Sequence, residues 1–334
     1  MKISSLDHKA RTSVVDGMEK FFRNQRGLLM VSLEMIKMDR REMVRLLVAL
    51  GEACGHTLRR VYLWGAFAHD QNPFLEDDTP DRYRGLGAFK MRMTSRCQYL
   101  NVWSKLTSLT VLALNYGYLS DQRGNVLLVL ASVLNGRLAT LQLLCLEDEI
   151  PNKYGGHAIP DRAWKAVLES CPGLQVHLVV DSMPEHSMVR AFISPSIPVH
   201  QFALFSGIQL EQKRPWDMDV TFRVLEKWYS DTLEVVLVHL YRNNEFFDRV
   251  LVKLLTALPR LTCLELIGII RDVDNVEKMC EILSRESLKL EKLRVCVQDG
   301  SNEGLKQKIE NIQSLYMEKL LNKGVEIDLT TYKL

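Results

Sequence analysis

The sequence lacks an excess of charge of either sign. Lys and Arg together number 43, Asp and Glu together number 41, and the formal net charge of the 334 residues is +2. A protein whose main partner is a phosphate backbone carries a clear excess of basic residues, because it replaces the counterions of the nucleic acid. The near balance therefore argues against nucleic acid as the partner.

Long apolar runs are also missing. The longest nearly unbroken run, Val126 to Val133, falls far short of the roughly 20 residues that a membrane-spanning helix needs, and no apolar stretch follows Met1 as it would in a secretory signal. The 7 cysteines include no Cys-x-x-Cys pair, and no Asn-x-Ser/Thr glycosylation site occurs. These absences predict a cytoplasmic or nuclear protein with reduced thiols and no membrane partner.

Motifs of catalysis and of cofactor binding are absent as well. The sequence contains neither of the glycine-rich phosphate-binding motifs and no Gly-x-Ser-x-Gly elbow. No two of the 8 histidines have the i, i+4 spacing of a helical zinc site, and no cysteine has a histidine partner within a local motif. The sequence thus predicts a protein that is not an enzyme and that has no cofactor and no metal site.

What the sequence does contain is an internal repeat. Leu106 to Leu114, Leu138 to Leu146 and Leu258 to Leu266 all follow the pattern Leu-x-x-Leu-x-x-Leu-x-Leu, and weaker copies surround them. The predicted strands recur about every 30 residues, apart from one interval of about 50, which is the spacing of a repeat protein. One residue represents each predicted strand: Leu33, Leu63, Leu114, Leu146, Leu178, Leu204, Val238, Leu266, Val295 and Ile327.

Helical periodicity without internal proline fills the segments between the predicted strands. The predicted helices are Arg41 to Ala53, Val126 to Leu134, Arg162 to Ser170, Val220 to Tyr229, Phe246 to Leu258, Val273 to Leu283 and Leu305 to Leu321. Asp219 and Asp272 are expected to cap helix N-termini. Four glycines are expected to end helices in the left-handed conformation: Gly55, Gly136, Gly173 and Gly324.

A strand and a helix of about 30 residues cannot bury their apolar faces alone, so neighbouring units must stack. The sequence therefore predicts an α/β leucine-rich-repeat solenoid, a horseshoe of about ten repeats of roughly 30 residues, with a parallel sheet on the concave side and α-helices on the convex side. We expect one domain over residues 1–334, with an insertion at 65–94 and a C-terminal capping helix and strand at 302–334. The insertion, rich in aromatic and charged residues, is either a docking loop for a partner or a flexible connector.

Alternation along the strands predicts a binding surface. If the motif leucines point into the core, the intervening residues face the concave side, including Leu143, Cys145 and Glu147 in one repeat. Aromatic and arginine side chains beside aliphatic ones suit a protein interface. A shift of the alternation by one residue would place the same residues in the core, and the stretch Val176 to Val180 is apolar at both alternate sets of positions. The expected protein-binding residues are Arg60, Tyr62, Trp64, Asn115, Glu147, Phe205, His239, Glu265 and Arg294.

Three of these segments resemble a known family. Leu106 to Leu119 (LTSLTVLALNYGYL), the step Cys171-Pro-Gly-Leu174 and Leu258 to Leu266 are similar to the leucine-rich-repeat regions of F-box proteins, above all the F-box-only group with divergent repeats. The resemblance covers nearly the whole chain. It implies that the repeats recognise a protein substrate, while a separate helical F-box docks the adaptor subunit of an SCF-type ubiquitin ligase.

No stretch before Gly27 is similar to an F-box, and Val14 to Leu33 look like the first helix and strand of the repeat region. The ligase adaptor is therefore an expected partner only if a longer form supplies an F-box. Two functions stay open: the substrate-recognition region of an SCF-type ubiquitin ligase, or a stand-alone leucine-rich-repeat scaffold or inhibitor that binds and caps a protein partner. The irregular repeats and the Cys-Pro step favour the first, and the missing F-box favours the second.

Overall fold

The structure, a computed structural model, describes residues 7–67, 97–119, 123–146, 159–181, 189, 191–206, 217–241, 246–248, 250–298 and 303–332. Within these residues the protein is α/β, and ten strands form a parallel sheet in which the strand order follows the chain. The chain divides into two compact units, Met1–Gln175 and Val176–Leu334. Each unit repeats the strand-then-helix order that the sequence predicts.

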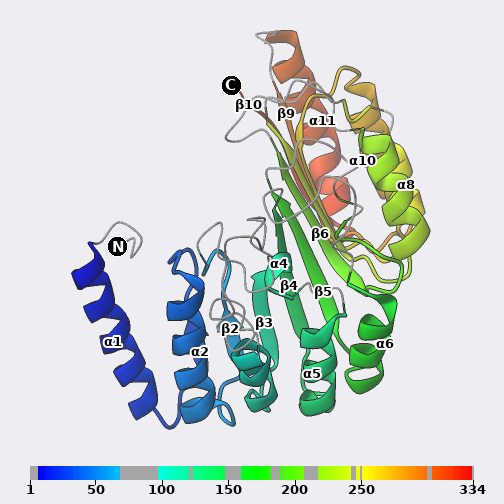
Figure 1. Cartoon of the computed structure of the whole chain (residues 1–334). Helices are drawn as coiled ribbons and strands as arrows, with labels where there is room; N and C mark the ends of the chain where they lie inside the picture. The colour runs from blue at the N-terminus through cyan, green and yellow to red at the C-terminus, as the bar shows by residue number, and fades with distance from the viewer. Residues whose placement is uncertain are drawn as a thin grey trace, which may run out of the picture. The chain divides into compact units, whose positions relative to one another are not determined.

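In the first unit, consecutive strands pair in parallel, and helices α1, α2, α5 and α6 follow one another along one side (Figure 1). Aspartates begin two of these helices, since the side chain of Asp7 accepts a hydrogen bond from the Ala10 amide and that of Asp39 accepts one from the Glu42 amide. The strands are β1 (Met30–Ser32), β2 (Arg60–Tyr62), β3 (Val111–Asn115) and β4 (Thr140–Leu146); the helices are α1 (His8–Asn24), α2 (Arg40–Cys54), α4 (Tyr116–Leu119), α5 (Asn125–Leu134) and α6 (Asp161–Ser170).

The second unit continues the same order. Its strands also pair in parallel, and α8, α10 and α11 lie on one side of them (Figure 1). The strands are β5 (Gln175–Asp181), which begins at the boundary, β6 (Val199–Ser206), β7 (Val235–Leu240), β8 (Cys263–Gly268), β9 (Lys292–Gln298) and β10 (Glu326–Tyr332); the helices are α8 (Met218–Tyr229), α9 (Leu251–Ala257), α10 (Asp274–Arg285) and α11 (Glu303–Leu321).

Alternate burial, most regular in β4, β5 and β7, separates a core side of the strands from the other side, which we call the open face. In β7, Val236, Val238 and Leu240 are buried, while the residues between them are half-buried. Each fully buried leucine or valine stabilises the fold by roughly 1.5–3 kcal/mol, so this alternation carries much of the stability. In β5 the buried residues are Val176, Leu178 and Val180, which settles the inward face of that strand and leaves His177 and Val179 on the open face.

Strand β4 shows where the sequence pattern misassigned the core. The motif aligns Leu112 with Leu144, but the sheet pairs Leu112 with Leu141. Leu143 and Cys145 are consequently buried, and the prediction that they face the concave side is wrong. Two adjacent leucines made both alignments compatible with the pattern. The open-face residues of β4 are Thr140, Gln142, Leu144 and Leu146.

Predicted helix ranges agree with the structure to within a few residues, except that α9 is shorter than predicted. Some predicted end signals are wrong. Gly136 and Gly324 have φ of +84° and +79°, as expected, but Gly55 is right-handed and Gly173 has no positive φ. The N-cap of α8 is Asp217, with Asp219 in its first turn, and Asp272 lies one residue before the N-cap of α10.

Gly55 is needed for a different reason, namely close packing. A Cβ at this position would lie 2.3 Å from the carbonyl oxygen of Lys105, closer than any real contact. The end of α2 therefore approaches the helical residues 97–105 closely, and only glycine permits this approach.

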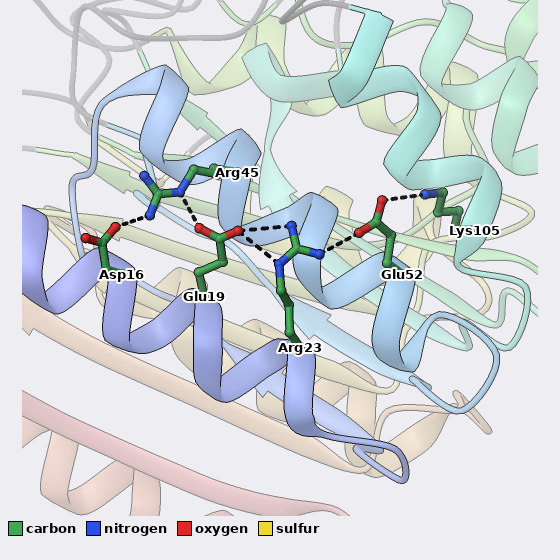
Figure 2. Close-up of polar contacts among 6 residues, drawn as sticks. All are labelled: Asp16, Glu19, Arg23, Arg45, Glu52 and Lys105. Carbon is green, nitrogen blue, oxygen red and sulfur yellow. Dashed lines mark hydrogen bonds and ion pairs between the residues drawn. The ribbon is translucent and has the colours of Figure 1, made fainter.

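An ion-pair network links the helices of the first unit (Figure 2). Arg45 on α2 pairs with Asp16 and Glu19 on α1. Arg23 on α1 lies 3.0 Å from Glu19 and 2.8 Å from Glu52, and Glu52 lies 3.3 Å from the amino group of Lys105. Opposite charges thus alternate from α1 across α2 to Lys105. Since most of these side chains are partly exposed, the network adds modestly to the buried contacts that hold α1.

Two predicted segments of the chain can be compared only in part. Apart from residues 65–67, the predicted insertion at 65–94 lies outside the described residues. The segment 302–334 contains helix α11 and strand β10, which pack against each other.

Candidate protein-binding site

Four of the predicted binding residues lie together on the open face of the second unit. Phe205 on β6 is directly opposite His239 on β7, and Glu265 on β8 is directly opposite Arg294 on β9. All four side chains are half-buried. Parallel pairing of the strands brings these residues together, although Phe205 and Arg294 are 89 positions apart in the sequence.

Hydrogen bonds and ion pairs join these residues into a chain across four strands. His239 Nε2 donates to Glu265 Oε1 over 2.7 Å, and Arg294 Nη1 donates to the same oxygen over 3.3 Å. Arg294 Nε lies 3.1 Å from Oδ2 of Asp328 on β10. We call His239, Glu265, Arg294 and Asp328 the ladder. Its inner carboxylate, Glu265, is only 14% exposed, so two donors compensate its desolvation.

The imidazole of the ladder is held in its neutral form. Burial lowers the pKa of His239, and the nearby Arg294 charge lowers it further, while the carboxylate of Glu265 acts in the opposite direction. Desolvation is the largest of these effects. At neutral pH His239 therefore acts as a hydrogen-bond donor without a formal charge.

Aromatic rings border the ladder. The ring of Phe205 lies edge-on to His239 with centroids 4.8 Å apart, and the ring of Tyr241 lies edge-on to His239 at 6.1 Å. Tyr241 also meets Tyr332, with centroids 5.9 Å apart and an interplanar angle of 71°. Edge-to-face pairs of this kind stabilise one another beyond the area that they bury.

Tyr241 and Tyr332 reach each other across two strands, because β8 and β9 lie between β7 and β10 in the sheet. We call this pair the tyrosine arch. Ile267 on β8 and Cys296 on β9 belong to the open face, yet they are only 6% and 9% exposed. Burial raises the pKa of both tyrosines, so their hydroxyl groups stay protonated. The arch therefore presents aromatic surface and hydroxyl groups beside the ladder.

The first unit carries three further predicted residues. Arg60 and Tyr62 lie on the open face of β2, where Arg60 is exposed and Tyr62 is half-buried. Tyr62 is opposite Ser32 on β1 and Ala113 on β3. Trp64, just after β2, is half-buried, and its indole Nε1 donates to the Gln142 carbonyl over 3.5 Å.

Asn115 does not offer a surface to a partner. It is 2% exposed, and its side-chain oxygen accepts a hydrogen bond of 2.7 Å from the amide of Gly65. Gly65 has φ of +61°, and a Cβ there would lie 2.6 Å from the sulfur of Met35. Asn115 thus ties the end of β3 to the turn after β2, a structural role that the alternation could not distinguish from surface exposure. The ninth predicted residue, Glu147, lies outside the described residues.

Sequence reasoning missed three residues of the site: Tyr241, Asp328 and Tyr332. A signal for each was present. Tyr241 continues the alternation of Val235, Leu237 and His239 by one more step, and Asp328 and Tyr332 alternate with the buried Ile327 and Leu329. Tyr241 and Tyr332 lie beyond the last aliphatic residue of their predicted strands, and the predicted surface includes no residue of the last strand.

Searches for metal-binding groups and for membrane-spanning helices concern the part of the chain that the structure describes. No group of three or more metal-binding side chains occurs there. None of the helices seen there combines the length and the apolar character that crossing a bilayer requires. No protein-family model matches the chain, and no curated protein matches it. The functional argument therefore depends on the residues themselves.

Proposed function

We propose that the chain is a non-catalytic protein-recognition module that binds a protein partner through the open face of the second unit. One observation carries the proposal: Phe205 and the residues of the ladder and the arch form one contiguous, half-buried cluster that extends from β6 to β10. Such side chains supply large contact area and directional hydrogen bonds, which is the composition of interface hot spots.

The strand order and the repeat period support a finer proposal about architecture. A sheet whose strands follow chain order, with a helix between most successive strands, is the arrangement of a leucine-rich-repeat solenoid. We propose that the strand-helix repeats stack in this way, with the strands on the concave side of a horseshoe. The partner would then bind on the concave side.

The resemblance to F-box proteins suggests a role for the bound partner. In this proposal the partner is a substrate of an SCF-type ubiquitin ligase, and the ligase adaptor joins only where a longer form supplies an F-box. Ubiquitination of the captured partner by such a longer form supports this assignment. A partner that is bound and inhibited without being modified supports the alternative, a scaffold or inhibitor.

Affinity capture with matched variants tests the binding surface. A Phe205→Ala/Tyr241→Ala double variant removes aromatic area from the second-unit face, and Tyr62→Ala/Trp64→Ala does so in the first unit. Lys227→Ala, at an exposed position of α8, is the control. We expect the control to retain the partners of the wild type, and the Phe205/Tyr241 variant to lose them. If the Phe205/Tyr241 variant folds and captures the same proteins as the wild type, the proposed surface is wrong.

A further inference from the structure

The open face of the second unit is acidic, although the chain as a whole has a formal charge of +2. Among the described strand residues of this face, four carboxylates stand against two cations, which leaves a net charge of −2. His239 adds no positive charge at neutral pH because its pKa is lowered. The six charged residues are Asp181, Glu265, Lys292, Arg294, Glu326 and Asp328.

The two carboxylates of the ladder differ in the hydrogen-bond donors that they contact. Glu265 accepts hydrogen bonds from His239 and Arg294. Among the residues that the structure describes, Asp328 pairs only with Arg294 Nε, and that buried nitrogen makes no directed hydrogen bond. The side chain of Asp328 is also 43% exposed. Asp328 therefore retains accessible acceptor capacity toward a second cation.

The surroundings of Asp328 place a carboxylate, an exposed hydroxyl group and an aromatic ring in one row. Asp328, Thr330 and Tyr332 follow one another on the open face of β10, and Thr330 is exposed. Strand geometry places Asp328 and Tyr332 about 13 Å apart, which an extended arginine and a tyrosine ring span together. The ladder already holds one guanidinium, that of Arg294, between its two carboxylates.

We propose that this part of the face binds an arginine side chain of the protein partner, with the guanidinium paired to Asp328 and the aliphatic stem lying over Thr330 toward Tyr332. The inference rests on the proposed recognition function and names the chemistry of the partner. Arginine fits better than lysine because a planar guanidinium donates several directed hydrogen bonds to a carboxylate.

A titration of the full chain followed by NMR tests the proposal. The probe is N-acetyl-arginine methylamide, and N-acetyl-citrulline methylamide is its neutral isostere. We expect saturable shifts of the Asp328, Thr330 and Tyr332 signals with a Kd in the millimolar range, at least about tenfold tighter for the arginine probe. Equal affinity for the two probes, or no saturable shift, overturns the proposal.

Two variants localise the effect. Asp328→Asn should abolish the preference for the arginine probe. Asp274→Asn, which removes an exposed, ion-paired carboxylate on α10, should leave the preference unchanged. A preference that survives Asp328→Asn places the arginine elsewhere and contradicts the proposal.

The failure of this inference can be distinguished from failure of the proposed function. If the probes do not discriminate but the Phe205/Tyr241 variant still loses its partners, the recognition face stands and its preference for arginine is wrong. If that variant keeps its partners, the recognition face itself is wrong.

Discussion

Two adjacent leucines of β4 give a sharp test of the core assignment. Leu143 is completely buried, and Leu144 lies half-buried on the open face. Replacing a buried leucine by alanine costs about 2–5 kcal/mol, because the transfer free energy of the removed atoms is lost and a cavity is left behind. At Leu144 roughly half of the transfer energy is at stake and no closed cavity forms, so the expected cost is about 1 kcal/mol. Both substitutions fall in one strand, so differences in strand propensity largely cancel.

Urea unfolding of the wild type, Leu143→Ala and Leu144→Ala measures this difference. Tryptophan fluorescence is a suitable signal, because the buried Trp103 and Trp164 lie in the same unit as β4. The structure predicts that Leu143→Ala loses at least about 1 kcal/mol more than Leu144→Ala. Equal losses of unfolding free energy would refute the burial argument. A larger loss for Leu144→Ala would show that Leu144 is the core residue, as the sequence motif predicts.

Three further predictions concern single interactions. Asn115→Ala should cost about 1 kcal/mol in urea unfolding, because the partly buried Gly65 amide loses its acceptor; an unchanged midpoint would contradict that role. Leu264→Asp should unfold its unit, because a buried unpaired carboxylate costs several kcal/mol; an unchanged thermal melt would show that the β8 register is misassigned. Arg23 and Lys105 lower the pKa of Glu52, so its ion pairs stabilise the fold fully above the ordinary carboxyl pKa and are lost as the pH falls through the lowered pKa. Acid unfolding followed by circular dichroism should show this component in the wild type and not in Glu52→Gln, and identical acid profiles would argue against it.

The repeat itself was predictable because it depends on local patterns. Alternating aliphatic residues and helical periodicity recur at a nearly constant interval, and all ten predicted strand positions fall within a strand or, at Leu33 and Leu63, directly after one. Neither pattern needs information from distant residues. The helix ranges could be predicted for the same reason.

Features that depend on exact register or on distant contacts were not predictable. At Leu143 and Leu144 the pattern allows two alignments, and only pairing with β3 selects one. Asn115 occupies a position with the correct parity for surface exposure, but its partner is a backbone amide 50 positions earlier in the chain. The contact of Tyr241 with Tyr332 requires that two strands separated by β8 and β9 bring their side chains together, which no local pattern encodes.

Site-specific photo-crosslinking tests most directly whether the open face binds the partner. A benzophenone amino acid is placed at Thr330, exposed on the open face of β10, or at Lys227, exposed on helix α8. Covalent adducts with a partner protein are predicted from position 330 and not from position 227. Adducts from position 227 with none from position 330 would contradict recognition through the open face.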